Sequence, residues 1–232
     1  MPRLLFINPV LRPDAKFKYS PVGLAFILTA VKKAGYSFDF IDMDADNLSA
    51  QDVEERLRGK TYDLCGFGCI VTGLALIAQL AEIVRAASPR CCIVAGNSVA
   101  TSIPRILLAR TEVDVAVLGE GDVTIVELIR AIEQGQAFDG ITGIAYLRSG
   151  VFTQNTPRPV IPNLDEIGFP DWTLFDMDKY NREQVPVSGS DEVQNCLPLN
   201  GARGCPFDCT FCYHVFKGQK YRKYSETAVI NE

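Results

Sequence analysis

Three cysteines stand close together in the 232-residue chain, in the run Cys205-Pro-Phe-Asp-Cys209-Thr-Phe-Cys212. Three thiolates on a tight loop are suited to a 4Fe-4S cluster with one iron left open to a ligand. A structural zinc site needs four ligands. The single histidine, His214, is the only nearby candidate, and one residue between it and Cys212 is a tight fit for a tetrahedron. The pattern favours an iron–sulfur cluster, with a Cys3His zinc site or free thiols as alternatives.

Four further cysteines are predicted to be buried side chains and not ligands. Cys65 and Cys69 fall on one predicted strand, which places them on the same face about 13 Å apart, too far to share a metal. Cys91 and Cys92 are neighbours on another predicted strand and point to opposite faces. We expect all four to pack as small apolar side chains.

The composition narrows the class of protein. Hydrophobic residues make up 47% and charged residues 22% of the chain, as in ordinary globular proteins. The net charge of −5 suggests neither nucleic acid nor an anionic membrane as a partner. The apolar run at residues 4–7 is too short for a signal peptide, and no apolar stretch reaches the roughly 18 residues of a membrane span. We therefore expect a cytoplasmic protein without a membrane-spanning segment.

The first part of the chain alternates between predicted strands and amphipathic helices. Short apolar runs predict strands at residues 3–8, 37–42, 64–70, 91–95 and 113–118. Helical spacing of apolar residues, or a short polar run, predicts helices at residues 24–31, 50–58, 76–84 and 125–132. This alternation predicts an α/β fold with a doubly wound parallel sheet of flavodoxin or Rossmann type. A ligand is expected beyond the carboxyl ends of the strands.

The cysteine run and its flanks resemble the cluster loop of radical S-adenosylmethionine (SAM) enzymes. Phe211 occupies the aromatic position before the last cysteine, and Arg203-Gly204-Cys205-Pro206-Phe207 and Phe216-Lys217-Gly218 are typical of the branch that carries an N-terminal cobalamin-binding domain. Upstream segments resemble the same branch, namely Asn8-Pro9, Pro21-Val22-Gly23-Leu24, Gly96 with its polar loop, Gly119-Glu120-Gly121-Asp122, and Pro157-Arg158 before Leu164-Asp165. The resemblance covers nearly the whole chain.

The resemblance implies an activity. A 4Fe-4S cluster on Cys205, Cys209 and Cys212 would bind SAM at its open iron, with Phe211 near the adenine. An electron from a donor such as flavodoxin or ferredoxin would cleave SAM to methionine and a 5′-deoxyadenosyl radical. The first hypothesis is methylation of an unactivated carbon in a small-molecule or peptide substrate, and cyclisation or rearrangement is the alternative. No catalytic acid or base is assigned.

The resemblance also implies a division of the chain. Residues 1–140 would form the cobalamin-binding domain, residues 141–196 a hairpin and linker, and residues 197–232 the start of a radical SAM (β/α) barrel. A hairpin is independently predicted by the turn Arg148-Ser149-Gly150. Because such a barrel needs several more strand–helix units, we expect a chain truncated early in its catalytic domain and inactive alone. A non-catalytic corrinoid-binding module is the alternative.

Nine residues that follow predicted strands are the expected cobalamin contacts. They are Thr72, Gly73, Gly96, Asn97, Ser98, Thr101, Gly119, Glu120 and Gly121. Glycines let the backbone approach a broad ligand, and hydroxyl or amide side chains can bond its amides or tail. The Asp-x-His-x-x-Gly motif of methionine-synthase-type cobalamin domains is absent and residues 1–140 contain no histidine, so the cobalt would have no histidine ligand from this domain. The lack of this histidine fits the radical SAM branch. The alternative is that these loops are ordinary turns, with Glu120 acting only at a helix N-terminus.

Overall fold

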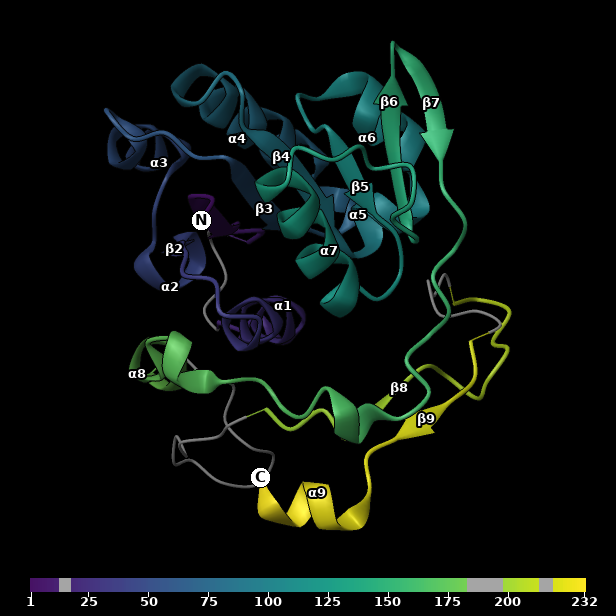
Figure 1. The fold of residues 1–232 in the computed structure, drawn as a ribbon. Coiled ribbons are helices and arrows are strands. Elements are labelled where there is room, and N and C mark those ends of the chain that lie inside the picture. The colour runs from purple at the N-terminus through teal and green to yellow at the C-terminus, as the bar shows by residue number, and fades with distance from the viewer. Residues whose placement is uncertain (13–17, 183–197, 213–218) are drawn as a thin grey trace.

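A seven-stranded sheet forms the centre of the computed structural model, which describes residues 1–12, 18–182, 198–212 and 219–232. Its order is β2-β1-β3-β4-β5-β6-β7 (Figure 1). The strands are β1 (Leu4–Asn8), β2 (Asp39–Asp42), β3 (Leu64–Gly68), β4 (Cys92–Gly96), β5 (Val115–Val117), β6 (Ile144–Arg148) and β7 (Val151–Gln154). β1 to β5 run parallel, whereas β6 and β7 are antiparallel at one edge. The predicted α/β class with a mainly parallel sheet is confirmed.

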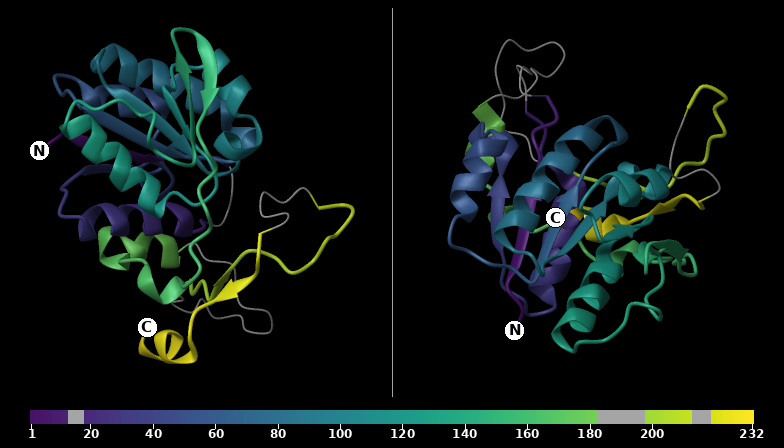
Figure 2. Two further views of the ribbon diagram at one scale, coloured as in Figure 1. Left: turned by 45° about the vertical axis from the view of Figure 1, so that its right-hand side comes forward. Right: turned by 90° about the horizontal axis from the view of Figure 1, so that it is seen from above.

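Helices cover both faces of the sheet (Figure 2). One face carries α1 (Val22–Lys33) and α7 (Asp122–Glu133). The other carries α3 (Ala50–Leu57), α4 (Leu74–Ala87), α5 (Asn97–Ser102) and α6 (Pro104–Arg110). Alternate strand residues supply the two cores, so that Phe6 packs under α1 and α7 and Ile7 under the other four helices. In the part of the chain that the structure describes, none of the helices has the length and apolar character needed to cross a membrane.

The carboxyl ends of β1 and β2 are closed by a buried polar cluster. The Asp42 carboxylate accepts hydrogen bonds from Asn8 Nδ2 at 2.8 Å and from the Tyr180 hydroxyl at 2.6 Å. Asp42 also caps α2 (Met43–Asp46), and Tyr180 belongs to α8 (Met177–Arg182). The three side chains are buried and hydrogen-bonded to one another. They therefore stabilise this end of the sheet and do not leave it open to a ligand.

Two local predictions are wrong in detail. The strand expected over residues 64–70 ends at Gly68, and the 3-10 helix η1 (Val71–Gly73) leads from it into α4. The sequence predicts no helix between β4 and β5, where α5 and α6 lie. These helices have 6 and 7 residues, and Pro104 begins the second one, so neither is long enough to show an apolar period of its own.

The predicted hairpin is confirmed, but it belongs to the sheet. β6 and β7 are joined by Ser149 and Gly150, which have φ values of 49° and 79° and so suit the tight turn between two antiparallel strands. β6 pairs antiparallel with β5, with Ala116 opposite Ala145. The hairpin therefore extends the sheet of the first domain, although the sequence assigns it to the connecting region. The division of the chain near residue 140 stays a prediction.

The last described segment lies outside these layers and packs along α1 (Figure 1). It contains β8 (Ala202–Arg203), β9 (Arg222–Lys223) and α9 (Glu226–Asn231), and the preceding connection contains the 3-10 helices η2 (Leu164–Glu166) and η3 (Trp172–Leu174). A third apolar cluster joins Phe26 of α1 to Leu164 and Tyr224. The antiparallel pair β8–β9, called the ribbon below, is thus anchored to the sheet domain.

Candidate functional site

A cavity of about 460 Å³ opens at the carboxyl ends of β3, β4 and β5, on the face covered by α1 and α7. Parallel α/β sheets bind ligands at this edge, and the volume lies within the usual range for small-molecule sites. Its apolar wall includes Phe6, Leu24, Val94, Val117 and Ile125. The cavity therefore has the position and lining of a ligand site.

The strand ends carry glycine where a side chain would fill the cavity. At Gly68 and Gly119, no atom of the described residues, chain neighbours aside, lies within 4 Å of an added Cβ, and at Gly96 only a backbone oxygen does, at 3.9 Å. The backbone at these three positions is open to a ligand. At Gly121 an added Cβ would lie 2.9 Å from Ile27 Cδ1, so this glycine instead lets α1 pack closely.

Two polar loops form the rim of the cavity. Asn97 follows β4 with a φ of 67°, a conformation that asparagine tolerates better than most residues. Its Oδ1 accepts a hydrogen bond from the Ser98 backbone N–H at 2.5 Å. Thr101 Oγ1 accepts from the Gly119 N–H at 3.0 Å, which ties the loop after β4 to the loop after β5. The rim is held in place by its own side chains.

The structure brings six of the nine expected cobalamin contacts to the cavity wall, namely Gly96, Asn97, Thr101, Gly119, Glu120 and Gly121. Thr72, Gly73 and Ser98 do not line it. Thr72 is exposed on η1. Gly73 is buried, and an added Cβ there would lie 2.1 Å from Cys69 Sγ and 2.7 Å from Leu11 Cδ2. Gly73 therefore makes room for protein atoms, and contacts of the nine residues with a cofactor stay a prediction.

Gly73→Ala is expected to lower the free energy of unfolding by about 1–3 kcal/mol, because the new methyl group overlaps a buried sulfur atom. Urea denaturation measures the loss. Adding Cys69→Ala should recover part of it, because that change removes the sulfur. Gly68→Ala is the matched control and should cost less than about 1 kcal/mol, since the space beside Gly68 is open. A Gly73→Ala chain as stable as the wild type would contradict this packing.

The outer wall of the cavity comes from a part of the chain that sequence reasoning placed in another domain. It is formed by Asn200, Ala202, Arg203, Gly204 and Gln219. These residues belong to the ribbon and to the segments beside it. The only signal in the sequence is that Arg203-Gly204 directly precedes the cysteine run. The ribbon therefore connects the cavity to the predicted cluster loop.

Arg203 attaches the first ribbon strand to the N-terminus of α7. Its Nη1 and Nη2 donate to the two carboxylate oxygens of Asp122 at 2.8 and 3.0 Å. The guanidinium also lies over the Phe26 ring, 4.5 Å from the centroid. Burial by itself would lower the pKa of Arg203, but the bonds with Asp122 outweigh it and raise that pKa. The Arg203 guanidinium therefore stays charged at physiological pH, and its contact with Asp122 is bidentate, the strongest form of such contacts.

Arg222 attaches the second ribbon strand to the same turn. Its Nη2 lies 2.6 Å from Glu120 Oε1, and its Nη1 donates to the Ile161 carbonyl at 2.6 Å. Glu120 Oε2 in turn accepts from the Ile161 N–H at 2.9 Å. Both oxygens of the Glu120 carboxylate therefore already have partners within the protein. Besides the role at a helix N-terminus that the sequence left open, Glu120 forms an ion pair with the ribbon.

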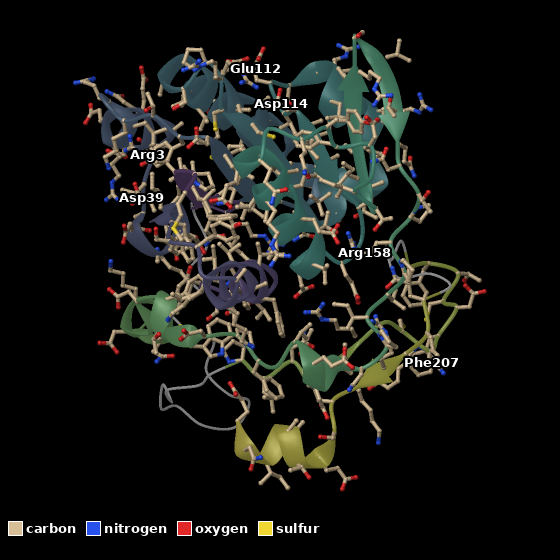
Figure 3. The ribbon with its side chains drawn as sticks, viewed as in Figure 1. Arg3, Asp39, Glu112, Asp114, Arg158 and Phe207 are labelled. Carbon is tan, nitrogen blue, oxygen red and sulfur yellow. The ribbon has the colours of Figure 1, made fainter. Side chains whose placement is uncertain are left out.

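The cysteine loop extends away from the sheet beyond the ribbon. Cys205 is half-buried, whereas Cys209 and Cys212 are exposed, and the Cys212 N–H donates to the Cys209 carbonyl at 3.2 Å in a turn. Phe211 is 91% exposed. Figure 3 shows Phe207 on this loop at the lower right of the view, whereas Asp114 lies near the top.

The described residues contain no group of three His, Cys, Asp or Glu side chains close enough to hold a metal ion. His214, the alternative zinc ligand, lies outside the described residues, as does the flank Phe216-Lys217-Gly218. The assignment of the cluster to Cys205, Cys209 and Cys212 therefore stays a prediction that rests on the sequence.

The cysteines of the sheet domain pack into the cores as predicted, although Cys69 lies after the end of β3 and Cys91 lies just before β4. Cys65, Cys69 and Cys91 are buried in the core beneath α3 to α6, and Cys92 packs at the core on the opposite face. Burial raises the pKa of the Cys69 thiol to about 11 and that of Cys91 to about 12. These thiols are protonated near neutral pH, which makes them poor metal ligands.

The comparison with protein families decides the class of the sheet domain, because residues 9–129 match the model of the B12 binding domain. The chain belongs to the B12-binding domain family. The match agrees with the cavity at the carboxyl edge of the sheet and confirms the resemblance in the cobalamin-binding part of the chain.

Curated relatives extend the likeness to the whole chain. An uncharacterised methyltransferase of Pyrococcus horikoshii is 29% identical over 214 residues, which are 91% of this chain and 44% of that protein. The anaerobic magnesium-protoporphyrin IX monomethyl ester cyclase of Cereibacter sphaeroides is 28% identical over 238 residues, 99% of this chain and 38% of that protein. The hopanoid C-3 methylase of Methylococcus capsulatus is 23% identical, and the match covers 42% of that protein. The chain thus spans about two-fifths of the length of these relatives.

Solved structures share the fold. The cobalamin-dependent SAM radical enzyme OxsB with aqua-cobalamin bound matches all of this chain and 31% of its own, with a TM-score of 0.80 and 18% identity. The radical SAM methyltransferase TsrM from Kitasatospora setae matches all of this chain and 45% of its own, with a TM-score of 0.73 and 17% identity. Both are named as radical SAM enzymes, and at these identities the likeness shows a shared fold.

Proposed function

We propose that this chain binds cobalamin and forms the N-terminal part of a radical SAM enzyme. The observation that carries the proposal is the cavity at the carboxyl edge of the sheet, whose outer wall is the ribbon that leads into the cysteine loop. The family match supports a corrinoid as the ligand of the sheet domain. The ribbon joins that site to the loop on which a cluster would lie.

The residues present fit a corrinoid with its nucleotide tail in the cavity. The apolar side chains Val94, Val117 and Ile125 suit a flat aromatic base, and the open backbone at Gly68 and Gly119 permits close approach. The sheet domain has no histidine to offer to cobalt. The tail would therefore be held by packing in the cavity and the corrin by the loops at its rim.

The cysteine loop fits a cluster with three protein ligands. Arg203 and Arg222 hold the two ribbon strands from which the loop departs and returns, so the ion pairs with Asp122 and Glu120 fix both ends of the loop. When bound, the cluster and SAM supply radical chemistry and cobalamin supplies a transferable methyl group. The chain's own part is to ligate iron through Cys205, Cys209 and Cys212, to pack Phe211 near the adenine of SAM, and to hold the corrinoid beside them.

Methyl transfer to an unactivated carbon is the first candidate reaction, since two relatives are named as methyltransferases and a third as a methylase. Ring formation is the second, because other relatives are named as cyclases. Either reaction would act on a small molecule or a peptide and take electrons from a donor such as flavodoxin or ferredoxin. The full-length protein is proposed as the enzyme, and the chain described here as its corrinoid-binding part.

Electron paramagnetic resonance of reduced cob(II)alamin bound to the 232-residue chain tests the corrinoid site. We expect no nitrogen splitting, because the sheet domain contains no histidine and the cavity residues would hold the tail base. His214→Ala should leave the spectrum unchanged. Splitting that persists in His214→Ala would come from the cofactor's own base and contradict a tail in the cavity. A folded chain that binds no cobalamin would contradict the proposed function itself.

A further inference from the structure

Two buried side-chain atoms of the described residues have no hydrogen-bond partner, Ser102 Oγ and Gln219 Oε1. Buried polar atoms are nearly always paired, so an unpaired one indicates a missing partner. Gln219 lines the cavity, whereas Ser102 does not. Gln219 is therefore a residue of the cavity wall whose buried side-chain oxygen has no partner among the described residues.

The position of Gln219 is set by the ribbon. The Arg222 guanidinium donates through Nε to the Lys220 carbonyl at 3.1 Å. On the facing strand, Gly204 has a φ of 87°, and an added Cβ there would lie 2.6 Å from the same carbonyl oxygen. The backbone next to Gln219 is thus in close contact across the ribbon, which in turn is tied to the sheet domain by Glu120. A side chain on so constrained a backbone can act as a fixed acceptor.

We propose that Gln219 Oε1 accepts a hydrogen bond from an O–H or N–H group on the nucleotide tail of the bound corrinoid. This inference rests on the proposed function, since it takes the cavity as the site of the tail. The residues on the sheet side of the cavity are mostly apolar or glycine. They can pack against the tail, but few of their side chains can recognise its polar groups. The ribbon therefore supplies a specificity-determining residue from outside the B12-binding part of the chain, residues 9–129.

Two groups on a corrinoid tail have the required chemistry. The ribose carries a hydroxyl group whatever the base, and an adenine base adds an amino group, whereas dimethylbenzimidazole has no N–H to donate. Cobinamide ends at the aminopropanol arm and lacks the phosphate, the ribose and the base. These three ligands separate the ribose, the base and the corrin ring as sources of the hydrogen bond.

Gln219→Met tests the proposal, because methionine has a similar length and no acceptor oxygen. Dissociation constants of the 232-residue chain for cobalamin, its adenine-base analogue and cobinamide are measured by absorbance titration. We expect about tenfold weaker binding of the adenine-base analogue in the variant, the effect of one lost hydrogen bond, and the same loss for cobalamin where the ribose is the donor. Cobinamide binding should be unchanged. Ser102→Ala is the matched control, since it removes the other unpaired atom away from the cavity, and it should change none of the three constants.

The outcomes separate the inference from the proposed function. A loss for both tailed corrinoids assigns the ribose hydroxyl, and a loss for the adenine form alone assigns the amino group; either supports the proposal. Wild-type binding of all three by the Gln219→Met chain would overturn it. If the wild-type protein binds cobinamide as tightly as cobalamin, the tail does not bind in the cavity and the inference is overturned. If the wild-type protein binds none of the three corrinoids, the proposed function is overturned. Unchanged cobinamide binding also shows that the variant is folded.

Discussion

Alanine in place of Cys205, Cys209 or Cys212 is expected to abolish cluster formation. The wild-type chain, reconstituted anaerobically with iron and sulfide, should hold about four irons with broad visible absorbance. Each of the three cysteines ligates one iron in the proposed site, and the fourth iron has no protein ligand. No further cysteine of the loop can therefore replace one that is lost. Iron and sulfide assays with absorbance spectra measure the loss. Variants that hold as much iron as the wild-type chain would contradict the assignment.

Two controls make this test specific. Cys65→Ala and Cys69→Ala should keep the full iron content, because these thiols are buried in the core of the sheet domain and burial raises their pKa. His214→Ala distinguishes the zinc alternative. A chain that binds one zinc and no sulfide, and loses the zinc in His214→Ala, would favour a Cys3His site over the cluster.

The second large effect concerns the ion pair between Arg203 and Asp122, whose side chains are 13% and 7% exposed. Asp122→Asn removes the bidentate partner of the buried Arg203 guanidinium and leaves only the Glu120 carboxylate, 4.0 Å away. Breaking a buried ion pair typically costs about 3–5 kcal/mol. We expect the ribbon to detach while the sheet core stays folded, because the core beneath α1 and α7 does not depend on the ribbon. Hydrogen exchange of residues 201–204 and 220–224 should accelerate strongly, and trypsin should cleave there sooner. Cobalamin binding should also weaken, since the outer wall of the cavity is lost.

A surface ion pair provides the control for this prediction. Lys32 and Asp171 lie 2.6 Å apart, but their side chains are 53% and 27% exposed. Asp171→Asn should therefore cost less than about 1 kcal/mol and leave the ribbon protected. If exchange in the ribbon were the same in Asp122→Asn as in the wild type, the ion pair would not be what holds the ribbon.

Features that depend on neighbouring residues were predictable. The strand β1 is an apolar run because both its faces are buried, and the apolar stripe of α1 repeats at helical spacing because one side faces the sheet. The cysteine run is recognisable for the same reason, since its three thiols share one short loop. The α/β class and most elements of the fold follow from such local patterns.

Features that depend on distant residues were not predictable. The helices α5 and α6 are too short to carry an apolar period, and the edge position of the β6–β7 hairpin depends on its pairing with β5. Gly73 shows the limit clearly. Its place after a strand predicts a ligand contact. In the structure, however, the space that a side chain at Gly73 would occupy is filled by Cys69 Sγ.

The sequence by itself therefore determined the sheet, its glycine-bearing strand ends and the three cysteines of the loop. Only the tertiary structure decided that the ribbon closes the cavity. Arg203 meets Asp122 across 81 positions, and Arg222 meets Glu120 across 102. No periodicity joins residues so far apart, because their pairing depends on the path of the whole chain between them. The same path brings Gln219 to the cavity, where its oxygen has no partner among the described residues.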